Sequence, residues 1–181
     1  MTPLTLPDFK EHLLASVKFV LPEVALVGAA CLLFLLACVR GGRTLSLLFA
    51  LAGVVGAGLI AWFVPEGISA ASGAGGVVFN PAYSPIDPTG AAGFVRWLSL
   101  AAAGVYLFLG WTDSKPAAPE YYGCWLVVAA GVSLVARSND LVTLFLSLEM
   151  VSIPTYVLLY LPATTKAGQE SAMKYFMLSV L

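Results

Sequence analysis

The chain has 181 residues, of which 60% are hydrophobic and 10% are charged, and its formal net charge is -1. Soluble domains have about 25% charged and 45–50% apolar residues, so this composition excludes a soluble globule and indicates a polytopic membrane protein. The few charges lie mostly at the ends of apolar segments, and nothing in the sequence suggests a nucleic-acid partner.

The first transmembrane span is predicted at residues 19–39, an apolar run that is long enough to cross a bilayer. Residues 1–18 precede it and mix charged and apolar side chains at roughly helical spacing, which predicts a short interfacial helix. Pro22 is expected in the first turn of the span, and Glu23 fits an acid at a helix N-terminus. A cleaved signal peptide is the alternative, but its apolar core would have only about 7–15 residues.

The second span is predicted at residues 44–63, after a tight turn that carries Arg40 and Arg43. Its small residues suit close contact between helices. Residues 64–93 form the one long connection and are rich in Gly, Ser and Pro. We predict a flexible linker there and not a phosphate-binding loop, because no Lys-Ser/Thr follows its glycines.

Four further helices are predicted, at residues 94–111, 121–136, 141–160 and 169–181. Ser138, Asn139 or Asp140 is expected to cap the helix that starts at residue 141. The last segment has about 13 residues, too few to cross about 30 Å of hydrocarbon, so we expect the N-terminal part of a larger subunit. The predicted fold class is all-α: one transmembrane domain, a polytopic helix bundle with about five complete spans plus the start of a sixth.

The cysteines and the single histidine give no sign of a metal or disulfide site. Cys31, Cys38 and Cys124 fall within apolar runs without paired spacing, so we expect buried, small, apolar side chains. His12 has no second histidine or cysteine near it, which favours a solvated or interfacial side chain over a metal ligand.

The cations of the loops bear on membrane orientation. If the spans alternate in direction, the two sides of the membrane hold equal numbers of cations. One side holds Arg40, Arg43, Lys115 and Lys166, and the other holds Lys10, Lys18, Arg96 and Arg137. The first loop is short and basic, whereas the long connection has no Lys or Arg. These features favour a cytoplasmic first loop and an N-terminus outside.

Glu149 is an acid near the middle of the predicted fifth span, about 12 Å from its start at Leu141. A charged side chain at that depth costs about 2.5–3.5 kcal/mol, so a functional role is the default and pairing between helices is the alternative. Pro154 removes the hydrogen bond to the carbonyl of Met150, which is expected to bend the helix beside the acid. Hydroxyls on the same helix either add to a polar site or bond back to their own helix, namely Ser147, Ser152 and Thr155.

Lys174 lies about five residues into the predicted sixth helix. It either extends back toward the headgroups or projects into the bundle. Inside the bundle, burial favours the neutral forms of a lysine and a carboxyl, which suits a pair that exchanges a proton. We predict that Glu149 faces the bundle near Met150 and Pro154, with Lys174 on the same interior side.

Three stretches give the sequence a resemblance to a known family. Residues 138–149, SNDLVTLFLSLE, with SIPTY at 152–156, resemble the fifth-helix signature of the antiporter-like membrane subunits of proton-translocating NADH:quinone oxidoreductase, respiratory complex I. ESAMKYF at 170–176 is similar to the start of the sixth helix, and LPE at 21–23 matches the opening of the first. Within this family the resemblance is strongest to the subunit N branch, and it carries nothing over to residues 66–93.

The resemblance implies a bundle of about fourteen helices with two inverted repeats, in the inner membrane of a bacterial-type cell. A soluble arm would oxidise NADH and pass electrons through FMN and iron–sulfur clusters to quinone. This chain would hold none of these cofactors and no metal. Its implied role is a proton half-channel, with Glu149 and Lys174 as the proton-transfer residues.

The implied partners are other membrane subunits of complex I, the lipid bilayer and protons. Two alternatives stay open: a subunit of a Mrp-type cation/proton antiporter or of a membrane-bound hydrogenase, and a structural or assembly membrane protein. In the latter, Glu149 and Lys174 would hold helices together.

Overall fold

The computed structural model describes residues 6–38, 42–63, 86, 90–112, 119–162 and 165–180. Within these ranges, side chains are described from Phe19 onward, apart from a few at helix ends. The predictions for the His12 side chain, for the turn at Arg40 and for most of the 64–93 connection fall outside the described residues.

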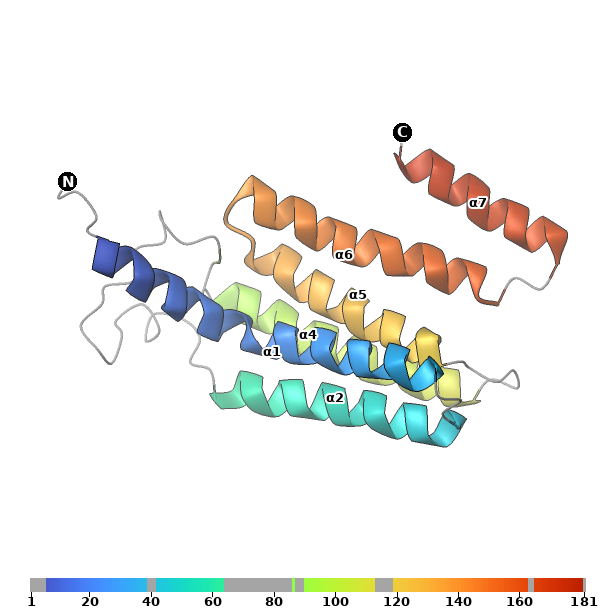
Figure 1. The fold of residues 1–181 in the computed structure, drawn as a ribbon, viewed down its shortest axis with the longest axis horizontal. Helices are drawn as coiled ribbons and strands as arrows, with labels where there is room; N and C mark the ends of the chain where they lie inside the picture. The colour runs from blue at the N-terminus through green and yellow to red at the C-terminus, as the bar shows by residue number, and fades with distance from the viewer. Residues whose placement is uncertain are drawn as a thin grey trace.

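The described chain consists of six α-helices: α1 (Leu6–Cys38), α2 (Arg43–Phe63), α4 (Gly90–Thr112), α5 (Pro119–Arg137), α6 (Leu141–Tyr160) and α7 (Lys166–Val180). Helices α1, α2, α4 and α5 pack into a bundle, α6 lies along α5, and α7 lies beyond α6 (Figure 1). Five helices are long and apolar enough to cross a membrane. The predicted all-α class with five spans is therefore confirmed.

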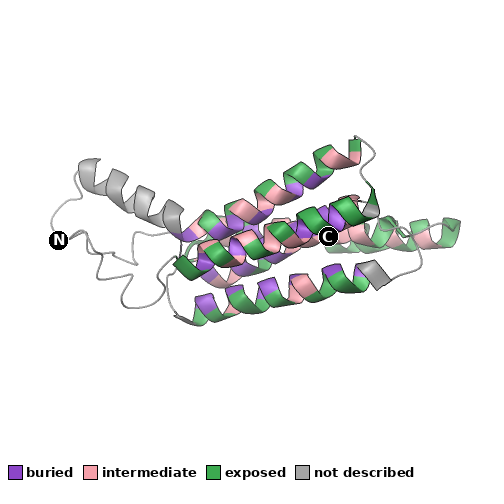
Figure 2. Cartoon of the chain, turned by 90° about the horizontal axis from the view of Figure 1, so that it is seen from below, coloured by how far each residue is buried: buried purple, intermediate pink, exposed green. Residues whose placement is uncertain are grey.

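The core of the bundle forms where the apolar stripes of four helices meet. Figure 2 shows buried residues on the inward faces and exposed residues on the outer faces, which carry many large apolar side chains. That pattern suits a protein surrounded by lipid. The core residues are Leu26, Ala30 and Leu33 of α1, Leu47, Ala50 and Ala57 of α2, Leu100, Ala103 and Leu107 of α4, and Tyr122, Leu126, Ala129 and Ala130 of α5.

Helix α1 differs from the prediction because it starts at Leu6 and continues without a break into the first span. Pro22 lies inside this helix and not in its first turn. A proline removes one hydrogen bond and bends a helix, but packing on neighbouring helices keeps the helix continuous. Figure 1 shows that α1 changes direction near its middle.

The start of α6 confirms the predicted cap. Asp140 has extended backbone angles, φ −129° and ψ 161°, and its Oδ1 accepts a hydrogen bond from the backbone N–H of Thr143 at 2.5 Å. That backbone donor lowers the pKa of the Asp140 carboxyl below its ordinary value. In the same turn, Ser138 forms an isolated antiparallel bridge with Ile86, which ties the segment before α4 to the α5–α6 turn.

The prediction of buried cysteines holds for only one of the three. Cys124 in α5 is buried, whereas Cys31 and Cys38 in α1 are exposed. Both lie on a part of the α1 surface that no described helix covers. A thiol behaves as a small apolar group and suits a lipid-facing position as well as a core position.

Candidate functional site

Two oppositely charged side chains pair inside the bundle, Glu23 of α1 and Arg96 of α4. Each residue is only 1% exposed. Nε of Arg96 donates to Oε1 of Glu23 at 2.8 Å, and Nη2 donates to Oε2 at 3.1 Å. The guanidinium therefore donates to both carboxylate oxygens. Such a bidentate pair is among the strongest ion-pair geometries in proteins.

A third helix, α5, contributes a hydroxyl group to this ion pair. Oγ of Ser133, on α5, donates to Oε1 of Glu23 at 2.5 Å. Nη2 of Arg96 also donates to the backbone carbonyl of Phe19, one turn before Glu23, at 2.5 Å. We call Glu23, Arg96 and Ser133 the polar cluster, because α1, α4 and α5 each contribute one side chain to it.

Arg137, at the end of α5, is a second fully buried cation close to the polar cluster. Its guanidinium carbon lies 6.0 Å from the centroid of the Phe19 ring, within the range of a cation–π contact. A cation at this position also interacts favourably with the C-terminal end of a helix dipole. Arg137 and Arg96 are therefore buried residues and not loop charges.

The sequence prediction for Glu23 was wrong, since the residue sits well inside α1 and is not an acid at a helix N-terminus. One signal in the sequence points to the pair. Glu23 lies four residues inside the span that starts at Phe19, and Arg96 five residues inside the span that starts at Ala91. These depths are about 6 and 7.5 Å from the same side of the membrane, because alternate spans run in the same direction.

Glu149 lies on a different face of the molecule from the polar cluster. The stripe of α6 that packs on α5 is marked by the buried Ser147 and Pro154. At about 100° per residue, Glu149 is about 200° from Ser147 and so points away from α5. It is half-buried, and no hydrogen bond or ion pair joins its side chain to another residue that the structure describes. Glu149 therefore points away from the α1–α5 bundle, on the side of α6 where α7 lies.

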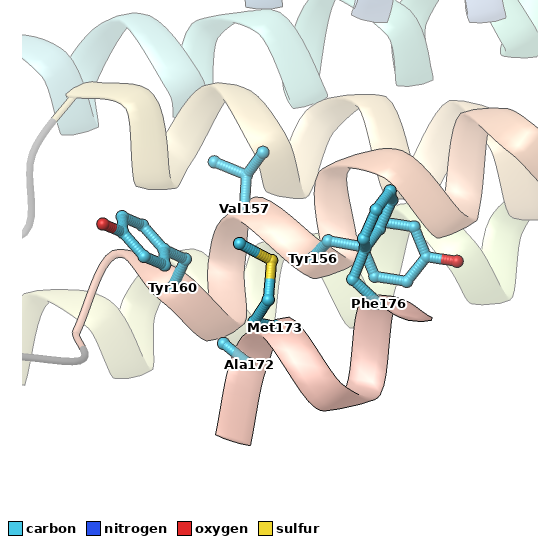
Figure 3. A pocket seen from close by; sticks show the side chains of 6 residues that line it. All are labelled: Tyr156, Val157, Tyr160, Ala172, Met173 and Phe176. Atoms are coloured by element: carbon cyan, nitrogen blue, oxygen red, sulfur yellow. The ribbon is translucent and has the colours of Figure 1, made fainter. Parts of the chain in front are cut away.

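Helix α7 covers part of the face that carries Glu149. Oγ of Ser179 donates to the hydroxyl of Tyr156 at 2.6 Å, and the rings of Tyr156 and Phe176 are 5.2 Å apart. Beside them lies an apolar groove of about 240 Å³, shown in Figure 3. It is lined by Tyr156, Val157 and Tyr160 of α6 and by Ala172, Met173 and Phe176 of α7.

The structure does not bring Lys174 to Glu149. Nζ of Lys174 lies 2.6 Å from Oε1 of Glu170 on its own helix, and the two side chains are 71% and 65% exposed. Helices α6 and α7 run antiparallel (Figure 1) and meet at Tyr156 and Ser179. From that contact, Glu149 lies about 10 Å along α6 and Lys174 about 7.5 Å the other way along α7, so about 18 Å separates them along the axes. The expected interior position of Lys174 is wrong within the described chain.

Two of the hydroxyls near Glu149 are used by their own helix. Oγ of Ser147 donates to the carbonyl of Thr143, and Oγ1 of Thr155 donates to the carbonyl of Val151, both at 2.6 Å. This settles the alternative that the sequence left open for these two residues, since such bonds satisfy the hydroxyl locally.

Close packing fixes α6 on α5 next to Glu149. A Cβ added at Gly131 of α5 would lie 2.8 Å from Cγ2 of Val151, 3.1 Å from its backbone nitrogen and 3.1 Å from Cβ of Met150. Real Cβ atoms essentially never lie closer than 3.0 Å to another atom, and the two contacts at 3.1 Å are tighter than most. Glycine at this position therefore lets the two backbones approach beside the acid.

Gly131→Ala is expected to destabilise the protein by about 1–3 kcal/mol, because the added methyl pushes α6 away from α5. Gly104→Ala is the matched control on α4, since nothing lies within 4 Å of its Cβ position. Alanine is the better helix former by about 0.8–1.0 kcal/mol, so this control is expected to be neutral or stabilising. Thermal denaturation in detergent measures both, and equal shifts in Tm would contradict the close packing.

These helices and their buried charges define a class: a multi-pass α-helical membrane protein with ionisable groups inside its spans. Comparison of the sequence with known proteins shows which membrane proteins of this class it is similar to. Residues 138–181, which include Glu149 and Lys174, match the family described as NADH:quinone oxidoreductase/Mrp antiporter, TM.

Individual relatives are named NADH-quinone oxidoreductase subunit N, in some cases with a copy number. The protein of Azorhizobium caulinodans is 28% identical over 174 residues, which cover 93% of this chain and 34% of the relative. Subunit N 1 of Solibacter usitatus is 41% identical over 73 residues, covering 40% of this chain and 15% of the relative. The Myxococcus xanthus protein is 45% identical over 60 residues, which cover 33% of this chain and 11% of the relative.

The chain spans about a third of the length of the first of these relatives, to which it is similar along most of its own length. No solved structure matches it. The resemblance to the subunit N branch that the sequence motifs predicted is confirmed by these similarities.

Proposed function

We propose that this chain is a membrane subunit of an NADH:quinone oxidoreductase that couples electron transfer from NADH to quinone to proton translocation, and that it contributes a proton half-channel. The observation that carries the proposal is its similarity to subunit N over 93% of its length. The intramembrane acid Glu149 lies within the residues that match the family. Intramembrane carboxylates are characteristic of proton pathways.

The partners in this proposal are other membrane subunits of the complex, in the inner membrane of a bacterial-type cell. Redox chemistry takes place in those partners, which hold FMN and iron–sulfur clusters and reduce quinone. This chain takes part in the reaction as a translocating subunit.

Glu149 is the proposed proton-carrying acid, because it is an intramembrane carboxyl without an ion-pair partner in the described part of the chain. Lys174 is proposed as a second proton-transfer residue, on the exposed side of α7 where it pairs with Glu170. Since the two lie about 18 Å apart along the helices, water or further groups would carry the proton between them.

The buried arginines favour the proposed orientation, with the N-terminus outside. Arg96 and Arg137 are buried among the helices, so they do not count as loop cations. Without them, Lys10 and Lys18 on one side stand against Arg40, Arg43, Lys115 and Lys166 on the other. The cation excess then lies on the side of the first loop, which is the cytoplasmic side.

The test uses inverted membrane vesicles from cells that lack the chain and from cells in which the gene is restored. We expect NADH-driven acidification of the vesicle interior, followed with a pH-sensitive dye, only when the chain is present. A Mrp-type antiporter is the second candidate, because the matched family includes it. That candidate predicts sodium-dependent proton exchange with no requirement for NADH, and this result would replace the proposal.

A further inference from the structure

We propose that the polar cluster is a permanently ionised lock that carries no protons itself and positions α5, and through α5 the helix that bears Glu149. This inference rests on the proposed function of Glu149. It assigns opposite tasks to two acids of the described spans: Glu23 is fixed and Glu149 exchanges its proton.

The hydrogen bonds of Glu23 support the fixed role. Its two carboxylate oxygens accept from Nε and Nη2 of Arg96 and from Oγ of Ser133. An ionised carboxylate only accepts hydrogen bonds, so all three donors stabilise the charged form. A proton on Glu23 would displace one donor and leave a buried guanidinium without its counter-charge.

Helix α5 connects this lock to Glu149. Ser133 and Gly131 are two residues apart, so they point in directions about 200° apart on the helix. The Ser133 side is bound to α1 through Glu23, and the Gly131 side packs on α6 at Met150 and Val151, the two residues that follow Glu149. A shift of α5 at the cluster therefore moves the backbone beside Glu149.

The charged groups around Glu23 define a pH signature. Among the described side chains, these are Arg96 from α4 and Arg137 from α5, while α2 contributes none. In Arg96→Gln, a buried carboxylate loses its ion-pair partner, and burial favours its neutral form, so acid relieves the defect. In Glu23→Gln, the Arg96 guanidinium loses the Glu23 carboxylate and stays charged at any accessible pH, so acid gives no relief.

The experiment measures NADH-driven proton pumping per assembled complex in native membranes, as a ratio to wild type at about pH 6 and about pH 8. The variants are Glu23→Gln, Arg96→Gln, the double variant that carries both changes, and Glu149→Gln. Glu23→Gln and Arg96→Gln, each alone, are expected to pump at about half of the wild-type rate per complex or less. The ratio of Arg96→Gln should recover at the lower pH, and that of the double variant should stay near wild type.

A matched pair of serines covers the case in which the charged single variants fail to assemble. Ser133 and Ser99 are both buried, but Ser99 donates to the carbonyl of Arg96 on its own helix at 2.8 Å. Ser133→Ala keeps the ion pair and removes the link to α5, so we expect a lower pumping ratio than in Ser99→Ala. Equal ratios in the two serine variants would overturn the proposal.

Two further results would also overturn it. A double variant as inactive as Glu149→Gln would show that Glu23 carries protons, and single variants that pump like wild type would show that the cluster positions nothing. The proposed function fails separately, if the wild-type assembly does not pump or if Glu149→Gln pumps normally. In that case thermal denaturation of the same variants still reports whether Glu23, Arg96 and Ser133 are coupled.

Discussion

Arg96→Gln is expected to lower the free energy of unfolding of the protein by about 3–5 kcal/mol, the usual cost of removing one partner of a buried ion pair. Glu23 is 1% exposed and would lose both donors of the Arg96 guanidinium, which leaves the Ser133 hydroxyl as its donor among the described side chains. Phe19 would also lose the donor to its carbonyl, now 2.5 Å away. Reversible denaturation in detergent micelles measures the change.

The double variant Glu23→Gln/Arg96→Gln is the control for this prediction. Replacing a buried ion pair by neutral groups is often close to neutral, so the double variant should lie within about 1–2 kcal/mol of wild type. The sum of the two single effects would then exceed the effect of the double variant, and the difference is the coupling between the two sites. Double-variant stability below that of either single variant would show that the pair is not a unit.

Lys174 and Glu170 also form a cation–carboxylate pair, but this pair is exposed, whereas Arg96 and Glu23 are buried. Its side chains are 71% and 65% exposed, and an i,i+4 pair of this kind contributes about 0.3–0.5 kcal/mol. Lys174→Gln is therefore expected to leave stability almost unchanged. The difference between the two pairs comes from burial and not from distance, since both have nitrogen–oxygen separations below 3 Å.

The parts of the fold that depend on local chemistry were predictable from the sequence. Apolar runs of bilayer length give the five spans, and an Asx residue before an apolar helix gives the cap at Asp140. The polar cluster depends instead on which helices become neighbours and on their rotation. Residues 73 and 110 positions away from Glu23 complete it, and no local pattern fixes such pairings.

The same reasoning explains why the predictions around Glu149 succeeded only in part. Its position near the middle of a span follows from counting residues along a helix. The face on which it lies depends on how α6 rotates against α5, and that rotation is set by the close approach at Gly131. Periodicity within α6 was uninformative, because apolar residues surround the whole helix.

Glu23 and Glu149 differ in the way that their proposed roles require. Glu23 has three donors from two other helices and is locked in its charged form. Glu149 has no such partner among the described residues and lies on a face that is only partly covered by α7. Glu149 therefore lacks, among the described residues, the fixed counter-charge that Glu23 has, which is the difference that the two proposed roles require.

Glu149→Gln is therefore expected to cut NADH-driven proton translocation per assembled complex at least tenfold. Proton-transferring side chains typically contribute about 10²–10⁴-fold to the rate of the step that they serve. Glutamine keeps the size and hydrogen-bonding capacity of the side chain but cannot carry a proton. A neutral amide also costs less than a charge at this depth, so assembly and stability should be retained. Glu170→Gln is the matched control for assembly and stability, because its acid is exposed on α7 and the change should leave both intact. Loss of the assembled complex in Glu149→Gln, with pumping intact in what remains, would assign Glu149 a structural role instead.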